Sequence, residues 1–190
     1  MSNFFPSTDD EPKPVGRYFK PKENGIYLLR VLTPMLAFDM AWKDQKPVRR
    51  ELDYEWAPTD YDPEGKFGPQ PPKRTWACAI WLHNFKPETT KGNFGLSQHV
   101  NSVQVWEITQ ASIRAALSKL GQDEDWGDPT KYDIKLTREN GKNDLPQYSV
   151  GTSLPKPLPD VAVQEWDALC EFGGFDINRL LDGGDPFKKP

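Results

Sequence analysis

The sequence predicts a mainly β protein with two helices. Several short runs are rich in β-branched or aromatic residues and are bounded by Gly or Pro, a pattern typical of strands. Two other segments repeat apolar residues at helical spacing. The chain has 190 residues, which fits one domain with appendages or at most two small domains. Its 7 Trp, 10 Phe and 6 Tyr supply large aromatic surfaces for a core, although only 36% of the residues are hydrophobic.

Three strands are expected before the first helix. Residues 26–32 are apolar and lie between Asn-Gly and Thr-Pro, which predicts a central strand. Residues 42–50 predict a turn and a short strand entry, and the Pro- and Gly-rich residues 57–73 predict a long loop. The third strand is expected at residues 103–108. The second strand, residues 75–83, alternates, so that one face is expected in the core (Trp76, Cys78, Ile80, Leu82) and the other outside it (Ala77, Ala79, Trp81, His83).

The second half of the chain predicts a helix, a hairpin and a second helix. Thr109 can cap a helix at residues 110–120 that ends at Gly121. Residues 131–138 and 147–150 predict the two strands of a hairpin, and the last helix is expected at about residues 160–172. Five strands with a helix between the third and the fourth is the layout of the OB-fold, a small Greek-key barrel that commonly binds oligonucleotides. Other α+β layouts share this order of elements.

We therefore expect an N-terminal arm at residues 1–24, an OB-fold domain at 25–158, and a C-terminal helix and acidic tail at 159–190. No stretch approaches the ~18 consecutive apolar residues of a membrane span, and the N-terminus lacks a basic start and an apolar signal core. These features predict a cytoplasmic protein that does not bind membranes. Cys78 and Cys170 are far apart and have no partners at ligand spacing, so both are expected to be buried free thiols.

Catalytic motifs are absent from the sequence. The only histidines are His83 and His99, and no GxSxG, HExxH, P-loop or GxGxxG motif is present. The acidic residues 123–128 lack EF-hand spacing and lie beside a turn, so solvation explains them better than a metal site. We therefore expect a protein that is not an enzyme and that uses no metal or cofactor.

The net charge of −4 hides two basic segments. Residues 12–50 carry nine basic and three acidic residues, and residues 73–119 carry six basic and two acidic residues. A basic face can bind phosphate on an anionic protein, because salt screens charges beyond roughly 8–10 Å. The alternative is that these are ordinary solvated Lys and Arg side chains.

Aromatic residues are interleaved with the cations of both basic segments. Single-stranded nucleic acid needs cations along its phosphates and flat side chains on which its bases stack. Trp42 and Trp81 can equally be core residues, and Lys135 and Arg138, on the predicted hairpin, can equally belong to a charged outer face. The candidate nucleic-acid-binding residues are Trp42, Lys43, Lys46, Arg49, Arg50, Lys73, Arg74, Trp81, His83, Phe85, Lys135 and Arg138, with Lys86 and Lys91 near the second strand.

Four motifs together resemble the phage-encoded single-stranded-DNA-binding proteins of the OB-fold class. They are Trp42-x-x-x-Lys-Pro-Val-Arg-Arg50, Thr75-Trp-Ala-x-x-x-Trp81, Val105-Trp-Glu-Ile-Thr-Gln-Ala-Ser-Ile113 and Trp126-Gly-Asp-Pro-x-x-Tyr-Asp-Ile-x-Leu-Thr-Arg138. The resemblance implies a nonenzymatic protein that coats and protects single strands during phage replication and recombination. It also implies that the strand crosses the barrel near residues 42–50 and 73–86. Related larger phage proteins insert a zinc knuckle, but this chain has only Cys78 in that region, so no metal is expected.

The C-terminus has a second resemblance. Residues 160–190 hold seven acidic and three basic residues, and Asp185-Pro-Phe187 is similar to the acidic, Pro-Phe-tipped tails of bacterial single-strand-binding proteins. This similarity implies that Asp185 and Phe187 bind replication or recombination proteins, although the trailing Lys188-Lys189-Pro190 departs from the pattern. The alternative function is a phage protein-interaction module, an adaptor or an inhibitor of a host enzyme, in which the same aromatic and basic residues form the interface.

Overall fold

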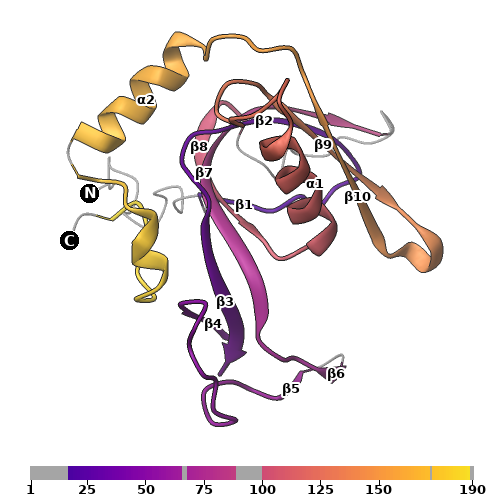
Figure 1. Cartoon of the computed structure of the whole chain (residues 1–190), viewed down its shortest axis with the longest axis vertical. Coiled ribbons are helices and arrows are strands. Elements are labelled where there is room, and N and C mark those ends of the chain that lie inside the picture. Colours follow the sequence, from indigo (N-terminus) through magenta and orange to yellow (C-terminus); the bar gives the residue numbers. More distant parts are fainter. Residues whose placement is uncertain (1–16, 66–67, 89–99, 172, 189–190) are drawn as a thin grey trace, which may run out of the picture.

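The computed structural model describes residues 17–65, 68–88, 100–171 and 173–188, and it confirms a mainly β protein (Figure 1). Eight strands form one mixed sheet, and two further short strands pair with each other in the long loop. The strands are β1 (Tyr18–Phe19), β2 (Gly25–Val31), β3 (Leu36–Lys43), β4 (Lys46–Arg50), β5 (Glu64–Gly65), β6 (Gly68–Pro69), β7 (Lys73–Pro87), β8 (Ser102–Ile108), β9 (Ile134–Asn140) and β10 (Pro146–Thr152). The helices are α1 (Ala111–Gln122) and α2 (Asp160–Glu171), with 3-10 turns η2 (Lys142–Asp144) and η3 (Ile177–Leu180).

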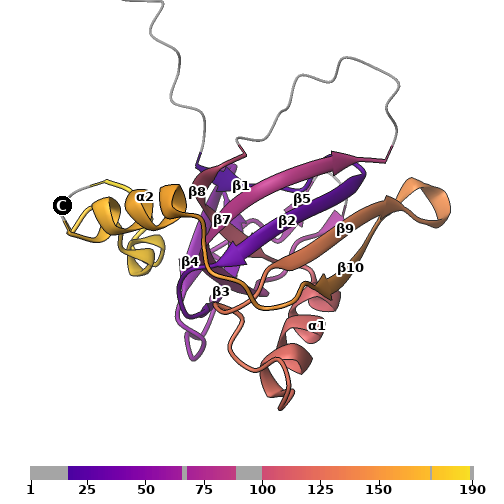
Figure 2. The same cartoon turned by 90° about the horizontal axis from the view of Figure 1, so that it is seen from above.

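The main sheet is not closed into a barrel. Its strand order is β1-β8-β7-β2-β9-β10, and among the described residues β10 pairs only with β9. The helix α1 follows β8 and contacts both β8 and β10 (Figure 2). The five strands expected from the sequence correspond to β2, β7, β8, β9 and β10, while β1, β3 and β4 add to them.

β7 is long enough to serve two parts of the molecule. Its 15 residues pair with β2 and β8 over residues 76–87, and with β3 over residues 73–77. The strand β4 pairs with β3 through a two-residue turn, Asp44-Gln45, in which both residues have positive φ (50° and 62°). Positive φ at both central residues matches the strand twist of a hairpin. We call β3, β4 and residues 73–77 the ribbon; it projects from the rest of the sheet (Figure 1).

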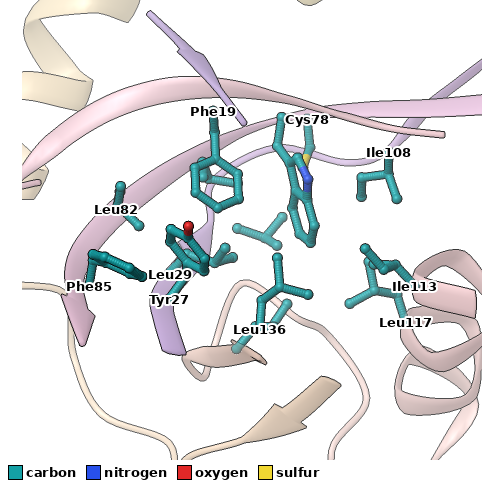
Figure 3. Close-up of a cluster of buried hydrophobic side chains, with 14 of the residues drawn as sticks. Phe19, Tyr27, Leu29, Cys78, Leu82, Phe85, Ile108, Ile113, Leu117 and Leu136 are labelled. Carbon is teal, nitrogen blue, oxygen red and sulfur yellow. The ribbon is translucent and has the colours of Figure 1, made fainter. Parts of the chain in front are cut away.

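The main hydrophobic core lies on the inner face of the sheet, under α1 (Figure 3). β7 contributes Cys78, Ile80 and Leu82 to it, as the alternation predicted, whereas Trp76 is only partly buried. Burial raises the pKa of the Cys78 thiol to about 12. Phe19 of β1 also packs in this core, so the described end of the expected arm, residues 17–24, contributes to the sheet.

The outer face of β7 and β8 is buried as well, which the sequence analysis did not expect. Helix α2 and the segment after it pack on this face (Figure 1). Ala162 and Trp166 of α2 cover Trp81, and Leu180 of η3 packs on the ribbon residue Phe38. Both faces of β7 are therefore in a core. Cys170 on α2 is exposed, contrary to expectation, and forms no disulfide.

No helix in the described part of the chain is both long and apolar enough to cross a membrane.

We predict that Trp81→Ala lowers the free energy of unfolding by about 3–5 kcal/mol, because it opens a cavity beneath α2 where the indole is 0% exposed. Trp42→Ala is the matched control: this indole is 43% exposed, and its loss should cost less than about 1 kcal/mol. Urea denaturation followed by circular dichroism measures both. Equal stability of the two variants would contradict the buried position of Trp81.

Candidate nucleic-acid interface

The ribbon carries most of the candidate residues, and its register assigns them to two faces. Residues paired directly across the ribbon share a face. Met40 pairs with Arg49 and Lys73, and Trp42 pairs with Pro47, so these five residues share the first face. The second face carries Asp39, paired with Arg50 and Arg74, and Lys43, paired with Lys46.

Arg49 binds a carboxylate of the protein. Its guanidinium donates to both carboxylate oxygens of Glu107, from Nε to Oε2 at 3.1 Å and from Nη2 to Oε1 at 2.7 Å. The pair is largely withdrawn from water, with Arg49 9% and Glu107 15% exposed. A bidentate pair of this kind fixes geometry. Arg49 therefore holds β4 against the end of β8.

Three other cations of the ribbon also have partners. Arg74 forms an ion pair with Asp39 at 2.9 Å, and the Arg50 guanidinium lies 5.3 Å from the centre of the Tyr54 ring. Lys43 donates to the backbone carbonyl of Thr59.

Lys46 and Lys73 are different. Both are exposed, and the side chain of neither makes a hydrogen bond or an ion pair with the described residues. They are the ribbon cations most available to a phosphate.

A cavity of about 660 Å³ opens beside the first face of the ribbon. The ribbon supplies Met40, Trp42, Pro47 and Arg49 to one part of its lining. The rest of the lining comes from β1 and the residues after it, the end of β8, β10 and a C-terminal turn: Tyr18, Phe19, Lys20, Pro21, Trp106, Glu107, Thr109, Gln110, Tyr148, Gly183, Gly184 and Asp185. Its lining thus combines aromatic rings with a few charged groups, which is typical of ligand sites.

The polar groups of the cavity influence one another. Burial raises the pKa of the Tyr18 hydroxyl, and the charges of Glu107 and Asp185 raise it further, while Arg49 opposes them. Tyr18 is therefore a neutral hydroxyl at physiological pH. Its hydroxyl can donate as well as accept a hydrogen bond.

Several cavity residues were not among the candidates from the sequence, notably Tyr18, Lys20 and Tyr148. Tyr18 and Lys20 belong to a short run, Arg17-Tyr-Phe-Lys20, in which aromatic rings are flanked by cations. That run lies in the first basic segment, residues 12–50, but it also fell in the expected arm, residues 1–24.

The structure withdraws two candidate aromatic residues from solvent. Trp81 is fully buried under α2, and Phe85 stacks on Tyr27 with the ring centres 4.5 Å apart. In this arrangement neither ring offers a face to a base. Both side chains pack in a core, the alternative that the sequence left open for Trp81.

His83 belongs to a buried ionic cluster. The carboxylate of Asp133, which is 0% exposed, contacts Arg30 at 2.7 Å, Lys156 at 2.8 Å and Nε2 of His83 at 3.0 Å. Burial alone would raise the pKa of Asp133, but hydrogen bonds from His83 and Lys156, together with the charge of Arg30, hold it well below its usual range. We call these four residues the Asp133 cluster. It joins β2, β7 and the residue that precedes β9 to the segment that leads into α2.

Lys135 and Arg138 lie on β9, outside the ribbon. Lys135 is exposed on the outer side of β9. Arg138 pairs across the hairpin with Tyr148, a cavity residue, and donates to the side-chain carbonyl of Asn24. Of the two, only Arg138 is next to a residue of the cavity lining.

The C-terminal candidates are docked on the body of the protein. The ring of Phe187 packs against Phe175 at 5.2 Å between ring centres, and Arg17 lies 4.8 Å from its centre. Asp185 lines the cavity and accepts a hydrogen bond from the backbone N–H of Phe187 at 3.0 Å. A partner that bound Phe187 would first have to displace it from this packing.

Comparison with protein-family models gives no match, and comparison with curated proteins gives none either. Among the described residues, no group of three or more His, Cys, Asp or Glu side chains is arranged to hold a metal ion. His99 and Lys91 lie outside the described residues.

We predict that Asp133→Asn destabilises the protein by about 3–5 kcal/mol at pH 7, because it leaves the buried Arg30 without a charged partner. Asn at exposed Asp125 is the control. The folded-state pKa of Asp133 is lowered, so its stabilisation is present above the unfolded value of about 3.9 and is lost as the pH falls toward the folded value.

The difference in unfolding free energy between wild type and Asp133→Asn should therefore shrink as the pH falls from about 6 to 3. Denaturation curves at several pH values measure it. A difference that is constant over this range would contradict a charged Asp133 in the folded state.

Proposed function

We propose that this protein binds single-stranded DNA along the ribbon and the adjoining cavity, with little overall sequence preference. The observation that carries the proposal is the exposed Trp42 on a ribbon whose Lys46 and Lys73 side chains have no hydrogen-bond or ion-pair partner among the described residues. Lys73 shares the first face with Trp42, and Lys46 lies on the second face beside the hairpin turn. Cations track a phosphate backbone, and an exposed aromatic ring stacks on bases with ~1–3 kcal/mol per base. The binding is noncovalent and involves no catalysis.

The strand order supports an OB-type architecture for the main sheet. In an OB-fold the first strand pairs with the second and the fourth, and a helix separates the third from the fourth. β2 pairs with β7 and β9, and α1 separates β8 from β9. The face of strands two and three, where OB-folds bind oligonucleotides, corresponds to β7 and β8. Here the C-terminal segment covers that face, so we assign binding to the ribbon.

The biological role that we propose follows from the sequence motifs. Their resemblance to phage single-stranded-DNA-binding proteins favours a protein that coats and protects single strands during phage replication and recombination in the host cytoplasm. Replication proteins are its expected partners.

A second candidate function, a protein-interaction module, is favoured by one surface of the molecule. The loop at residues 51–62, which follows β4, carries five acidic and no basic residues, and exposes Leu52 and Tyr54. Such a surface repels phosphate and suits a basic protein partner. Dependence of affinity on strand length and on salt distinguishes the two functions.

We predict that oligo(dT) quenches the tryptophan fluorescence of the wild-type protein, with affinity that rises with strand length to a plateau and is much weaker for duplex DNA. Trp42→Ala should remove most of the quenching and weaken binding about fivefold or more, because one stacking platform is lost. The folded state of the variant is checked by its thermal melting. Absence of binding in fluorescence and in filter assays would leave the protein-interaction module as the function.

We predict that the double variant Lys46→Ala/Lys73→Ala binds oligo(dT) about tenfold more weakly at low salt. The slope of log K against log[salt] should fall in magnitude by about 1.4, or about 0.7 for each lost phosphate contact. Lys119→Ala/Lys131→Ala is the matched control, because it removes the same charge from exposed positions on α1 and before β9. Equal effects of the two double variants would contradict a binding site on the ribbon.

A further inference from the structure

We propose that the cavity beside the ribbon receives one unpaired base of the bound strand and favours bases with an exocyclic amino group over thymine. This inference rests on the proposed function and refines it, since it assigns one position of base readout within a site that otherwise contacts the backbone and stacks on bases of any kind.

The walls of the cavity suit a flat aromatic ligand. Trp42 and Pro47 line it from the ribbon, Met40 lies beside them, and Tyr148 lines it from β10. Its volume, about 660 Å³, falls within the ~300–1,000 Å³ of small-molecule sites and accommodates a base with its sugar. Trp42 also belongs to the exposed surface of the ribbon, so a strand on the ribbon can insert a base without leaving it.

The charge balance of the cavity favours a neutral group. Lys20 and Arg49 supply two positive charges to its lining, and Glu107 and Asp185 supply two negative charges. A phosphate gains little net attraction there, whereas Lys46 and Lys73 outside the cavity face no such carboxylates in their immediate contacts. The backbone is therefore expected to stay on the ribbon while the base enters.

The carboxylates of Glu107 and Asp185 give the cavity lining several hydrogen-bond acceptors. Arg49 takes one hydrogen-bond position on each oxygen of Glu107, and each carboxylate oxygen can accept more than one. Asp185 accepts the Phe187 N–H at Oδ1, and its Oδ2 accepts no hydrogen bond from the described residues. Ionised carboxylates cannot donate, so they pair with donor groups on a ligand.

Bases differ in the donors that they offer to such acceptors. Cytosine, adenine and guanine each carry an amino group, and carboxylates are established acceptors for the cytosine N4 amino group. The thymine N3–H lies between two carbonyl oxygens that a carboxylate repels. The cavity should therefore bind an amino-bearing base more tightly than thymine.

The test measures the affinity of the full chain for dT12 and dC12 at pH 8, and for dT12 with one central cytosine or one central abasic site. We expect dC12 to bind at least fivefold more tightly than dT12, and a single central cytosine to recover part of that gain. Pyrimidine oligomers are chosen because their weak self-stacking keeps the comparison free of strand structure.

Three variants locate the preference, and one controls for charge. Glu107→Gln, Asp185→Asn and Tyr18→Phe each change one polar group of the cavity, and at least one of them should reduce the ratio of dC12 to dT12 affinity to below twofold. Asp182→Asn is the control: it removes the same charge three residues from Asp185, does not line this cavity, and should keep the ratio. Tyr18→Phe removes only a hydroxyl, so it keeps the test open if a carboxylate variant fails to fold.

Equal affinity of the wild-type protein for dC12 and dT12 overturns the inference and leaves the proposed function intact. A preference that persists in all three cavity variants also overturns it, because the readout then lies elsewhere. Absence of binding to both oligomers overturns the proposed function itself, and the inference with it.

Discussion

The structure depends on the burial of both faces of β7. Cys78, Ile80 and Leu82 pack inward, while Ala77, Ala79 and Trp81 pack outward beneath the C-terminal segment. A strand that is buried on both faces has a fixed position in the molecule, and the first residues of β7 are part of the ribbon. In the proposed OB-type arrangement, the same burial occupies the face that OB-folds use for oligonucleotides. The position of Trp42 and its neighbouring lysines is therefore set by apolar packing elsewhere in the molecule.

The Asp133 cluster extends this arrangement to the C-terminus. Besides its ion pair with Asp133, Arg30 donates to the backbone carbonyl of Lys156 at 2.9 Å, and the Ser153 N–H donates to the carbonyl of Asp133 at 2.9 Å. These bonds hold the segment before α2 against β2 and β9. Because α2 must reach Trp81 from there, a buried charge cluster and an apolar contact cooperate in covering β7. A buried ion-pair cluster adds little to the free energy of unfolding, but removing one partner lowers that free energy strongly, because a charge is left buried without a partner.

Local sequence patterns predicted the local elements of this fold. The apolar run of β2, the alternation of β7 and the periodicity of α1 correspond to elements at nearly the expected residues. The expected cap of α1 was wrong: its N-cap is Gln110, with no side-chain cap hydrogen bond, and the helix continues past Gly121 to Gln122. β3 was missed before residue 42, although Phe38, Met40 and Trp42 alternate with Asp39, Ala41 and Lys43, and its pairing with residues 73–77 is set by long-range contacts. The Arg49–Glu107 ion pair joins residues that are 58 positions apart, and α2, which covers Trp81, is also distant from it in the sequence. Local sequence patterns do not predict such long-range contacts. The composition identified the cations and aromatic rings, but only the packing determines which of them remain exposed to a ligand.

Packing thus separates two kinds of charge that look alike in the sequence. Arg30, Arg49 and Arg74 have carboxylate partners within 3 Å, so a phosphate competes for them against an existing charge. Lys46 and Lys73 have no such partner among the described residues, and a phosphate near them replaces only water and counterions. In the proposed complex with single-stranded DNA, counterion release would concentrate on these two lysines, and the salt dependence of binding would report their number. The number of basic residues in a segment therefore overstates the number of phosphates that it can neutralise. Arg30, Arg49 and Arg74 are already paired with carboxylates of the protein, and Lys46 and Lys73 remain the ribbon cations most available to a phosphate.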